Sequence, residues 1–159
     1  MDEMIDNGII DSTANLLLDE NEQVREQAAL LVGSFVTSVH ARTMIEPALP
    51  PLQAQLSDSV QFVREAAAWA FHKLSVNRAG CDIIVNSGSA ASIIQSLMSF
   101  TTEDTIKESH GRYVILLSEC LCNITNYDNG VEPLLGKKAV QSMNHVLSKP
   151  LANLLGPFK

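Results

Sequence analysis

The side chains best suited to chemistry in this chain are its cysteines and histidines. Cys120 and Cys122 are two residues apart, which places their thiols about 200° apart around a helix and unsuited to holding one metal ion. No serine, cysteine or carboxylate forms a recognisable catalytic arrangement with the histidines, His40, His72, His110 and His145. There is also no glycine-rich phosphate loop. The sequence therefore predicts no enzyme, no metal site and no cofactor.

Trp69, the only tryptophan, is the clearest candidate for contact with a partner. It lies four residues after Glu65 and four before Lys73, so on a helix the three side chains share one face. An aromatic ring among charged groups is a common composition of binding hot spots. Burial of the ring in the core is the competing interpretation, and the sequence leaves both open.

The helix that would carry Trp69 belongs to an internal repeat. The segment VREQAA at residues 24–29 returns as VREAAA at residues 63–68, an offset of 39 residues. Leu17 and Leu56 keep the same register, as do Asp19 and Asp58. A period of this length is typical of two- or three-helix units that stack into a solenoid.

A third copy follows in a looser register. Leu97 lies 41 residues after Leu56, and residues 84–88 resemble residues 4–8 at the matching offset of 80. Residues 121–125 resemble residues 71–75 at an offset of 50, so roughly nine residues (50 against 41) are inserted before the last helix of this unit. We expect this insertion, around Phe100 to Gly111, to be an exposed and mobile excursion.

Apolar residues at helical spacing predict where the helices lie. Each of the first two units has a short helix, an acidic turn with capping side chains, and a longer helix. Pro47 takes the position that Gly8 and Gly88 hold in the other units. The expected helices are 9–18, 24–36, 49–56, 62–74, 81–86, 90–98 and 113–125, followed by short segments at 132–135, 138–147 and 150–155.

Composition and charge narrow the class of protein. The chain is 46% hydrophobic but only 5% aromatic, which favours closely packed Ala- and Leu-rich helices and an all-α fold. A net charge of −7 without a lysine and arginine cluster argues against nucleic acid as a partner. The uncharged run 83–102 contains Asn86, Gln95 and several serines, so it predicts two short helices joined at 87–89 and no membrane attachment.

The first residues, Met1-Asp2-Glu3, are followed by no apolar segment, so the sequence predicts no secretory signal. We expect a cytoplasmic protein. In that compartment Cys81, Cys120 and Cys122 are expected to be reduced, buried thiols rather than a disulfide framework.

Over most of its length the chain resembles armadillo repeats, with features of HEAT repeats. The armadillo pattern G-x-I-x-x-L-x-x-L-L, an acidic turn and V-R-x-x-A-A-x-A-L-x-N-L is matched by residues 8–35, and more closely by residues 63–74. Residues 77–80 and 84–88 resemble the usual link into the next unit. The resemblance implies a right-handed α-solenoid over residues 1–159. Its units are expected at about 1–38, 39–77 and 78–128, with a partial unit at 129–159.

Armadillo importins bind basic peptides through W-x-x-x-N on the third helix of a unit. Here Trp69 is followed by Lys73 in place of the asparagine, and the third unit has Glu119 in place of the tryptophan before Asn123. The corresponding residues of the first unit are Leu30 and Ser34. No unit has the complete pair, which argues against nuclear import.

The acidic turns carry a second family feature. Asp19 and Arg25 are six residues apart, as are Asp58 and Arg64, and this spacing resembles the Asp/Arg ladder that links neighbouring HEAT units. The resemblance implies a structural role for these side chains. Arginines that line the inner surface of the solenoid are the competing interpretation.

Together these features predict a non-catalytic scaffold that binds a protein partner in a shallow groove along its long helices. Because the chain is acidic, we expect the bound segment to be basic or amphipathic. Equivalent positions along the long helices define what we call the long-helix surface: Glu26, Leu30, Glu65, Trp69, Lys73, Glu119 and Asn123.

The competing function is a structural subunit that docks end-on in a large assembly. Solenoids normally close with polar capping units, but neither end of this sequence looks capped, and the tail stays apolar at Leu151, Leu154, Leu155 and Phe158. We therefore expect an end-on contact with another chain, and self-association or marginal stability of the isolated protein. The chain also resembles ciliary radial-spoke-head armadillo proteins in size and repeat type, which implies a cytoskeletal or ciliary axoneme location.

Overall fold

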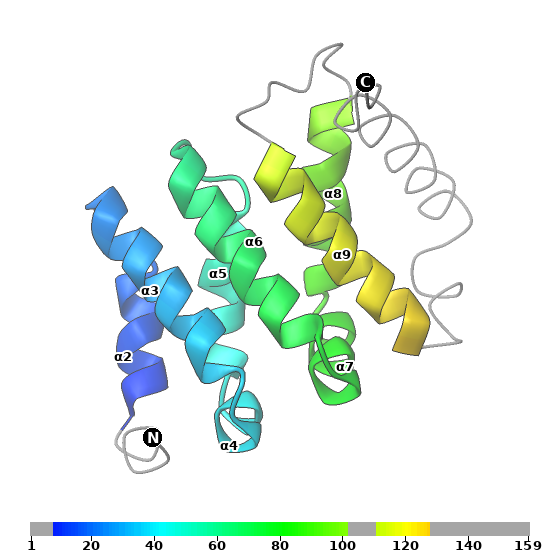
Figure 1. The fold of residues 1–159 in the computed structure, drawn as a ribbon. Helices are drawn as coiled ribbons and strands as arrows, with labels where there is room; N and C mark the ends of the chain where they lie inside the picture. The colour runs from blue at the N-terminus through cyan, green and yellow to red at the C-terminus, as the bar shows by residue number, and fades with distance from the viewer. Residues whose placement is uncertain (1–7, 102–110, 128–159) are drawn as a thin grey trace, which may run out of the picture.

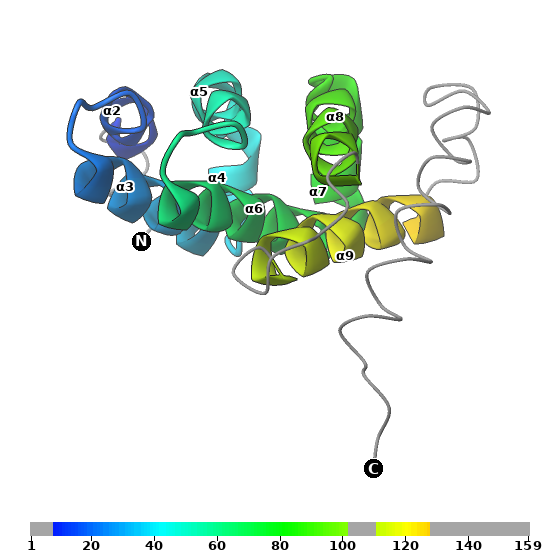
Figure 2. The same cartoon turned by 90° about the horizontal axis from the view of Figure 1, so that it is seen from above.

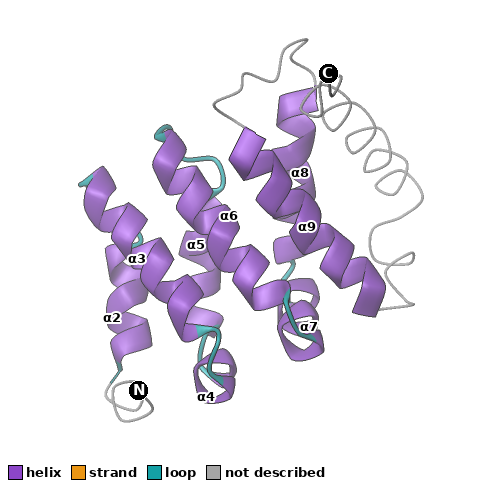
Figure 3. Ribbon diagram, in the orientation of Figure 1, coloured by secondary structure: helices purple, strands orange, loops and turns teal. Residues whose placement is uncertain are grey.

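A computed structural model of the chain describes residues 8–101 and 111–127. Within these two ranges every regular element is helical, and the helices are joined by short turns (Figure 3). The prediction of an all-α solenoid is confirmed. The expected fourth unit, the first seven residues and most of the predicted insertion lie outside the described residues.

The helices form two layers that are stacked side by side (Figures 1 and 2). The long helices α3, α6 and α9 make one layer, and α2, α5 and α8 make the other, while the short helices α4 and α7 lie near the ends of α3 and α6. The bounds are α2 Ile9–Leu16, α3 Glu22–Phe35, α4 Val39–Thr43, the 3₁₀ helix η1 Glu46–Ala48, α5 Leu49–Gln55, α6 Gln61–Ser75, α7 Arg78–Asn86, α8 Ser89–Thr101 and α9 Gly111–Tyr127.

The expected helices agree with these bounds to within a few residues, and the differences have local causes. Helix α7 begins three residues early because the side chain of Asn77 accepts a hydrogen bond from the Gly80 amide (3.0 Å) and caps the first turn. Helix α8 runs on to Thr101, and α9 begins at the buried Gly111. Both limits of the predicted excursion are therefore helical, and only residues 102–110 remain for it.

The connections between units repeat the same backbone geometry. Gly8 precedes α2 with a φ of 75°, and Gly88 precedes α8 with a φ of 77°, both in the left-handed region that favours glycine. The two glycines, which the sequence relates by an offset of 80 residues, thus have the same backbone conformation. Pro47 replaces them in the second unit, where it opens η1 as expected of a proline in a first helical turn.

Buried side chains from all the described helices form one continuous core. Leu17 and Leu56, predicted to be equivalent, are 1% and 2% exposed. Val24 and Val63 are equivalent at the same offset, but Val63 is fully buried whereas Val24 is only half-buried. Helix α3 lies at one end of the described stack, whereas α6 lies between α3 and α9 (Figure 1).

Polar side chains of one unit also bond to the unit before it. The Nε2 atom of Gln55 donates to the carbonyl of Leu17 (2.8 Å), and the hydroxyl of Tyr113 donates to the carbonyl of Leu56 (2.7 Å). The two acceptors are equivalent residues just after α2 and α5, where carbonyls lack partners inside the helix. These bonds fix the spacing of neighbouring units.

Gly80 is predicted to tolerate substitution far less well than Gly88. A Cβ atom at Gly80 would overlap the carbonyl oxygen of Leu74, whereas a Cβ atom at Gly88 would meet no atom within 4 Å. We expect Gly88→Ala to lower the free energy of unfolding by about 1 kcal/mol through backbone strain, and Gly80→Ala to lower it by more, about 3 kcal/mol. Urea denaturation measures both, and an equal loss in the two variants would contradict the predicted overlap.

Candidate functional site

The long-helix surface is built around one face of α6. Glu65, Trp69 and Lys73 follow one another at four-residue spacing, so they lie along the same side of the helix. Trp69 is half-buried, and the Nζ atom of Lys73 lies 5.5 Å from the centroid of its ring, within the range of a cation–π contact. Gln61 donates to Oε1 of Glu65 (2.8 Å) and orients that carboxylate.

The ring of Trp69 also takes part in packing between two units. A Cβ atom at Gly33 of α3 would overlap the Cε3 and Cζ3 atoms of the indole ring, so the missing side chain at this position makes room for Trp69. Trp69 packs against the core and remains partly exposed. The two interpretations of Trp69, packing and contact, therefore do not exclude each other.

The remaining members of this surface lie on the helices to either side. Glu26 and Leu30 are half-buried on α3, and Leu30 packs against the core. On α9, Glu119 is exposed and its Oε2 atom lies 3.6 Å from Nδ1 of His72, while Nδ2 of Asn123 donates to the Ser75 hydroxyl (3.1 Å). All seven residues thus lie on neighbouring helices of one layer, and their role in binding stays a prediction.

Two exposed apolar side chains extend this surface and were missed by the sequence analysis. Phe62 is 40% exposed and lies two turns before Trp69 on the same side of α6. Ile115 of α9 is 46% exposed and corresponds to Glu65 at the offset of 50. The seven-residue spacing between Phe62 and Trp69 is the sequence signal that identifies the first of them.

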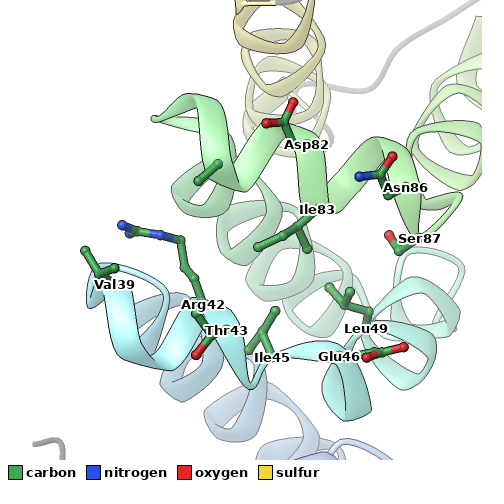
Figure 4. A pocket seen from close by; sticks show the side chains of 11 residues that line it. Val39, Arg42, Thr43, Ile45, Glu46, Leu49, Asp82, Ile83, Asn86 and Ser87 are labelled. Carbon is green, nitrogen blue, oxygen red and sulfur yellow. The ribbon is translucent and has the colours of Figure 1, made fainter.

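A separate cleft of about 570 Å³ lies between α4 and α7, away from the long-helix surface (Figure 4). Its inner wall is apolar, with buried Ile45 and Leu49 facing Ile83 of α7. The lining also includes charged and polar groups, namely Arg42, Thr43, Glu46, Asp82, Asn86 and Ser87. The shallow groove expected along the long helices stays a prediction.

Arg42 links this cleft to the fold. Its Nη1 atom donates to the carbonyls of Val36 (2.7 Å) and Thr37 (3.3 Å), just after the end of α3. Carbonyls at a helix end lack internal partners and carry partial negative charge, so the guanidinium caps α3. One wall of the cleft is therefore fixed by a long helix.

The ladder predicted from the acidic turns is present between the first two units. Arg25 of α3 donates from Nε to Oδ2 of Asp58 (2.9 Å) and from Nη2 to Oδ1 (3.1 Å), and from Nη1 to the carbonyls of Asp19 and Glu20 (2.9 Å each). Both charged side chains are largely shielded from water. Burial alone would raise the pKa of Asp58, but the hydrogen bonds from Arg25 and from the Val60 amide outweigh it and lower that pKa.

The three thiols do not share one environment, contrary to the sequence-based expectation. Cys81 and Cys120 are buried, and burial raises the pKa of Cys81 to about 11 and that of Cys120 to about 12. Cys122 is exposed, because a displacement of two residues carries its side chain to the outer side of α9. All three are free cysteines, as expected.

In a comparison with known protein families, one family model matches part of the chain. Residues 22–74, which run from the start of α3 almost to the end of α6, match the family model of the HEAT-like repeat. A search of curated proteins gave no match.

Every helix of the described ranges is too short or too polar to cross a membrane. Within the same ranges, no group of three or more histidine, cysteine or acidic side chains could hold a metal ion.

The contact between Gly33 and Trp69 predicts an unusual response to alanine. In a helix interior, Gly→Ala ordinarily stabilises by up to about 1 kcal/mol, but here the new methyl group would displace the indole ring. We expect Gly33→Ala to lower the free energy of unfolding by about 1–3 kcal/mol and to shift the tryptophan emission to longer wavelength.

The control for this variant is Ser34→Ala, the next position on α3, where the side chain is exposed. Its free energy of unfolding should stay within about 0.5 kcal/mol of the natural protein. A stabilised Gly33→Ala protein with unchanged emission would show that Trp69 does not lie against α3.

The Arg25–Asp58 pair predicts a specific dependence of stability on pH. Because folding lowers the pKa of Asp58, the pair stabilises the protein fully above the unfolded-state pKa of about 3.9, and this contribution is lost as pH falls through the lower folded-state pKa. Asp58→Asn should lower the free energy of unfolding by about 1–3 kcal/mol at pH 7. Below about pH 4 the variant and the natural protein should become more similar in this free energy.

Urea denaturation across a pH series measures this difference. Asp19→Asn is the matched control, because Asp19 occupies the equivalent turn but has no arginine side chain bonded to its carboxylate among the described residues. Equal losses at Asp19 and Asp58, or a loss at Asp58 that does not change with pH, would contradict the assigned role of the pair.

Proposed function

We propose that this protein is a non-catalytic scaffold that binds a protein segment along its long-helix surface. The HEAT-like match supports the general role, since repeats of this kind present extended surfaces to other proteins. The observation that carries the specific proposal is the half-buried Trp69, whose ring lies against α3 and under Lys73, with the exposed Phe62 two turns before it on α6. Partly buried aromatic residues on a rigid helix are the usual anchors of binding energy.

Charge gives the chemistry of the bound segment. Three carboxylates lie on this surface, one on each long helix, at Glu26, Glu65 and Glu119. Lys73 is its one basic member, and it lies against the Trp69 ring. A segment with basic side chains toward the carboxylates and apolar side chains toward Trp69, Phe62 and Ile115 fits this arrangement. The preferred partner is therefore a basic, amphipathic peptide or helix.

Selection from a displayed library of random 15-residue peptides tests this function. We expect the selected peptides to be enriched in lysine and arginine and to contain at least one large apolar residue. Phe62→Ala should weaken their binding about tenfold, and Glu65→Lys should weaken it mainly at low ionic strength. Partial quenching of the Trp69 fluorescence by acrylamide should decrease when a selected peptide binds.

Leu18→Ala is the control for these variants. Leu18 is 67% exposed but follows α2, on the other layer, so its loss should leave binding unchanged. Selected peptides without excess positive charge, or peptides that bind the Phe62→Ala and Glu65→Lys variants as tightly as the natural protein, would refute the proposal.

A further inference from the structure

The outer side of α2 and α3 lies at one end of the described stack. The corresponding side of the next unit, on α5 and α6, is covered by the unit before it. Leu31 of α3 is 37% exposed, whereas its equivalent Ala70 on α6 is 1% exposed. Ala70 faces the preceding unit, because a Cβ atom at Gly33 of α3 would lie 3.1 Å from the Ala70 Cα atom. Leu31 thus lies where a preceding unit would contact α3.

Two more positions follow the same rule. Leu16 is 43% exposed, but its equivalent Gln55 is buried and donates to the carbonyl of Leu17 in the preceding unit. Val24 is half-buried, while its equivalent Val63 is completely buried. We call Leu16, Val24 and Leu31 the end stripe. In the second unit, the equivalent positions are all buried in the stack.

Asp19 provides an independent, polar part of the same pattern. In the second unit, Oδ1 of Asp58 accepts from the Val60 amide (2.9 Å), and the carboxylate also receives Arg25 from the preceding unit. In the first unit, Oδ1 of Asp19 accepts from the Asn21 amide (2.8 Å), so the turn has the same form. Among the described residues, no arginine side chain is bonded to the Asp19 carboxylate.

From these contacts we infer that the end stripe and Asp19 form a docking surface for a helical unit of a second protein. The occupant is a pair of packed helices with apolar side chains toward the end stripe and an arginine placed to form a bidentate pair with Asp19. The docked unit would continue the geometry of the α3–α6 contact within this chain. It is independent of the long-helix surface.

At the other end of the described stack, a second copy of this chain has no arginine in the register of Arg25 and Arg64. The helix at that end is α9, in which the position equivalent to Arg64 is the buried Val114. Arg25 is already bonded to Asp58, and Nη1 of Arg64 donates to the carbonyls of Asp58 and Ser59. The chemistry therefore points to a partner with an arginine of its own.

The test uses a copy of residues 8–46 inserted directly before Gly8 in the full chain. The copied Arg25 then faces Asp19 just as Arg25 faces Asp58. We expect the fusion to raise the midpoint of thermal unfolding by at least about 5 °C. Changing either partner of the new pair, by Asp19→Asn in the original chain or Arg25→Ala in the copy, should remove about 2–4 °C of that gain. Asp19→Asn should leave the midpoint of the unfused chain unchanged.

A second variant and a measurement of mass decide between occupants. Leu31→Glu should abolish the gain in the fusion and leave the unfused chain unchanged, and sedimentation equilibrium should show the unfused chain as a monomer. Destabilisation of the unfused chain by Leu31→Glu would mean that a segment of this chain already covers the stripe, and overturns the proposal. A dimer that is lost on Leu31→Glu would assign the surface to a second copy and also overturns it, as does a fusion without increased stability.

Discussion

Close contact of α6 with both α3 and α9 is the constraint on which the rest of the described structure depends. Three consecutive alanines, residues 66–68, are all buried there, and Gly33 lets the Trp69 ring approach α3. Small side chains on two sides of one helix bring its neighbours near, and each neighbour then positions its own short helices. A unit of this kind cannot bury its apolar sides alone, so its stability comes largely from the units beside it.

The same packing accounts for the composition of the long-helix surface. Because α6 gives two of its sides to α3 and α9, the side that stays open carries Phe62, Glu65, Trp69 and Lys73. A tryptophan held by the core on one edge loses little side-chain freedom when it meets a partner, which lowers the entropic cost of binding. The Trp69 ring thus contributes both to packing and to the proposed binding, so a substitution of Trp69 is expected to change both.

Sequence reasoning succeeded where the backbone or a local turn requires a particular residue. Gly8 and Gly88 adopt left-handed conformations, and Arg25 reaches the acidic turn of the next unit. Each of these features depends on residues close in sequence or at the repeat offset. The offset alone therefore located most helices and the first link between units.

Burial and concave surfaces could not be read in the same way, because they depend on neighbours. Val24 and Val63 occupy matching sequence patterns, yet among the described helices only α6, which carries Val63, has a long helix on both sides. The cleft between α4 and α7 depends on the distance between two short helices from different units, which no local pattern encodes. Phe62 lies one turn beyond Glu65 on the face of Trp69, outside the charged positions that mark this face in the sequence.

The unequal burial of the cysteines has a practical consequence for oxidation and for labelling. Thiols with pKa values near 11 and 12 are almost entirely protonated at neutral pH and react slowly with oxidants and alkylating reagents. Only Cys122 combines a free thiol with exposure to solvent. A maleimide fluorophore would thus attach to one known position on α9, and energy transfer from Trp69 on α6 would report the separation of the two helices without any engineered cysteine.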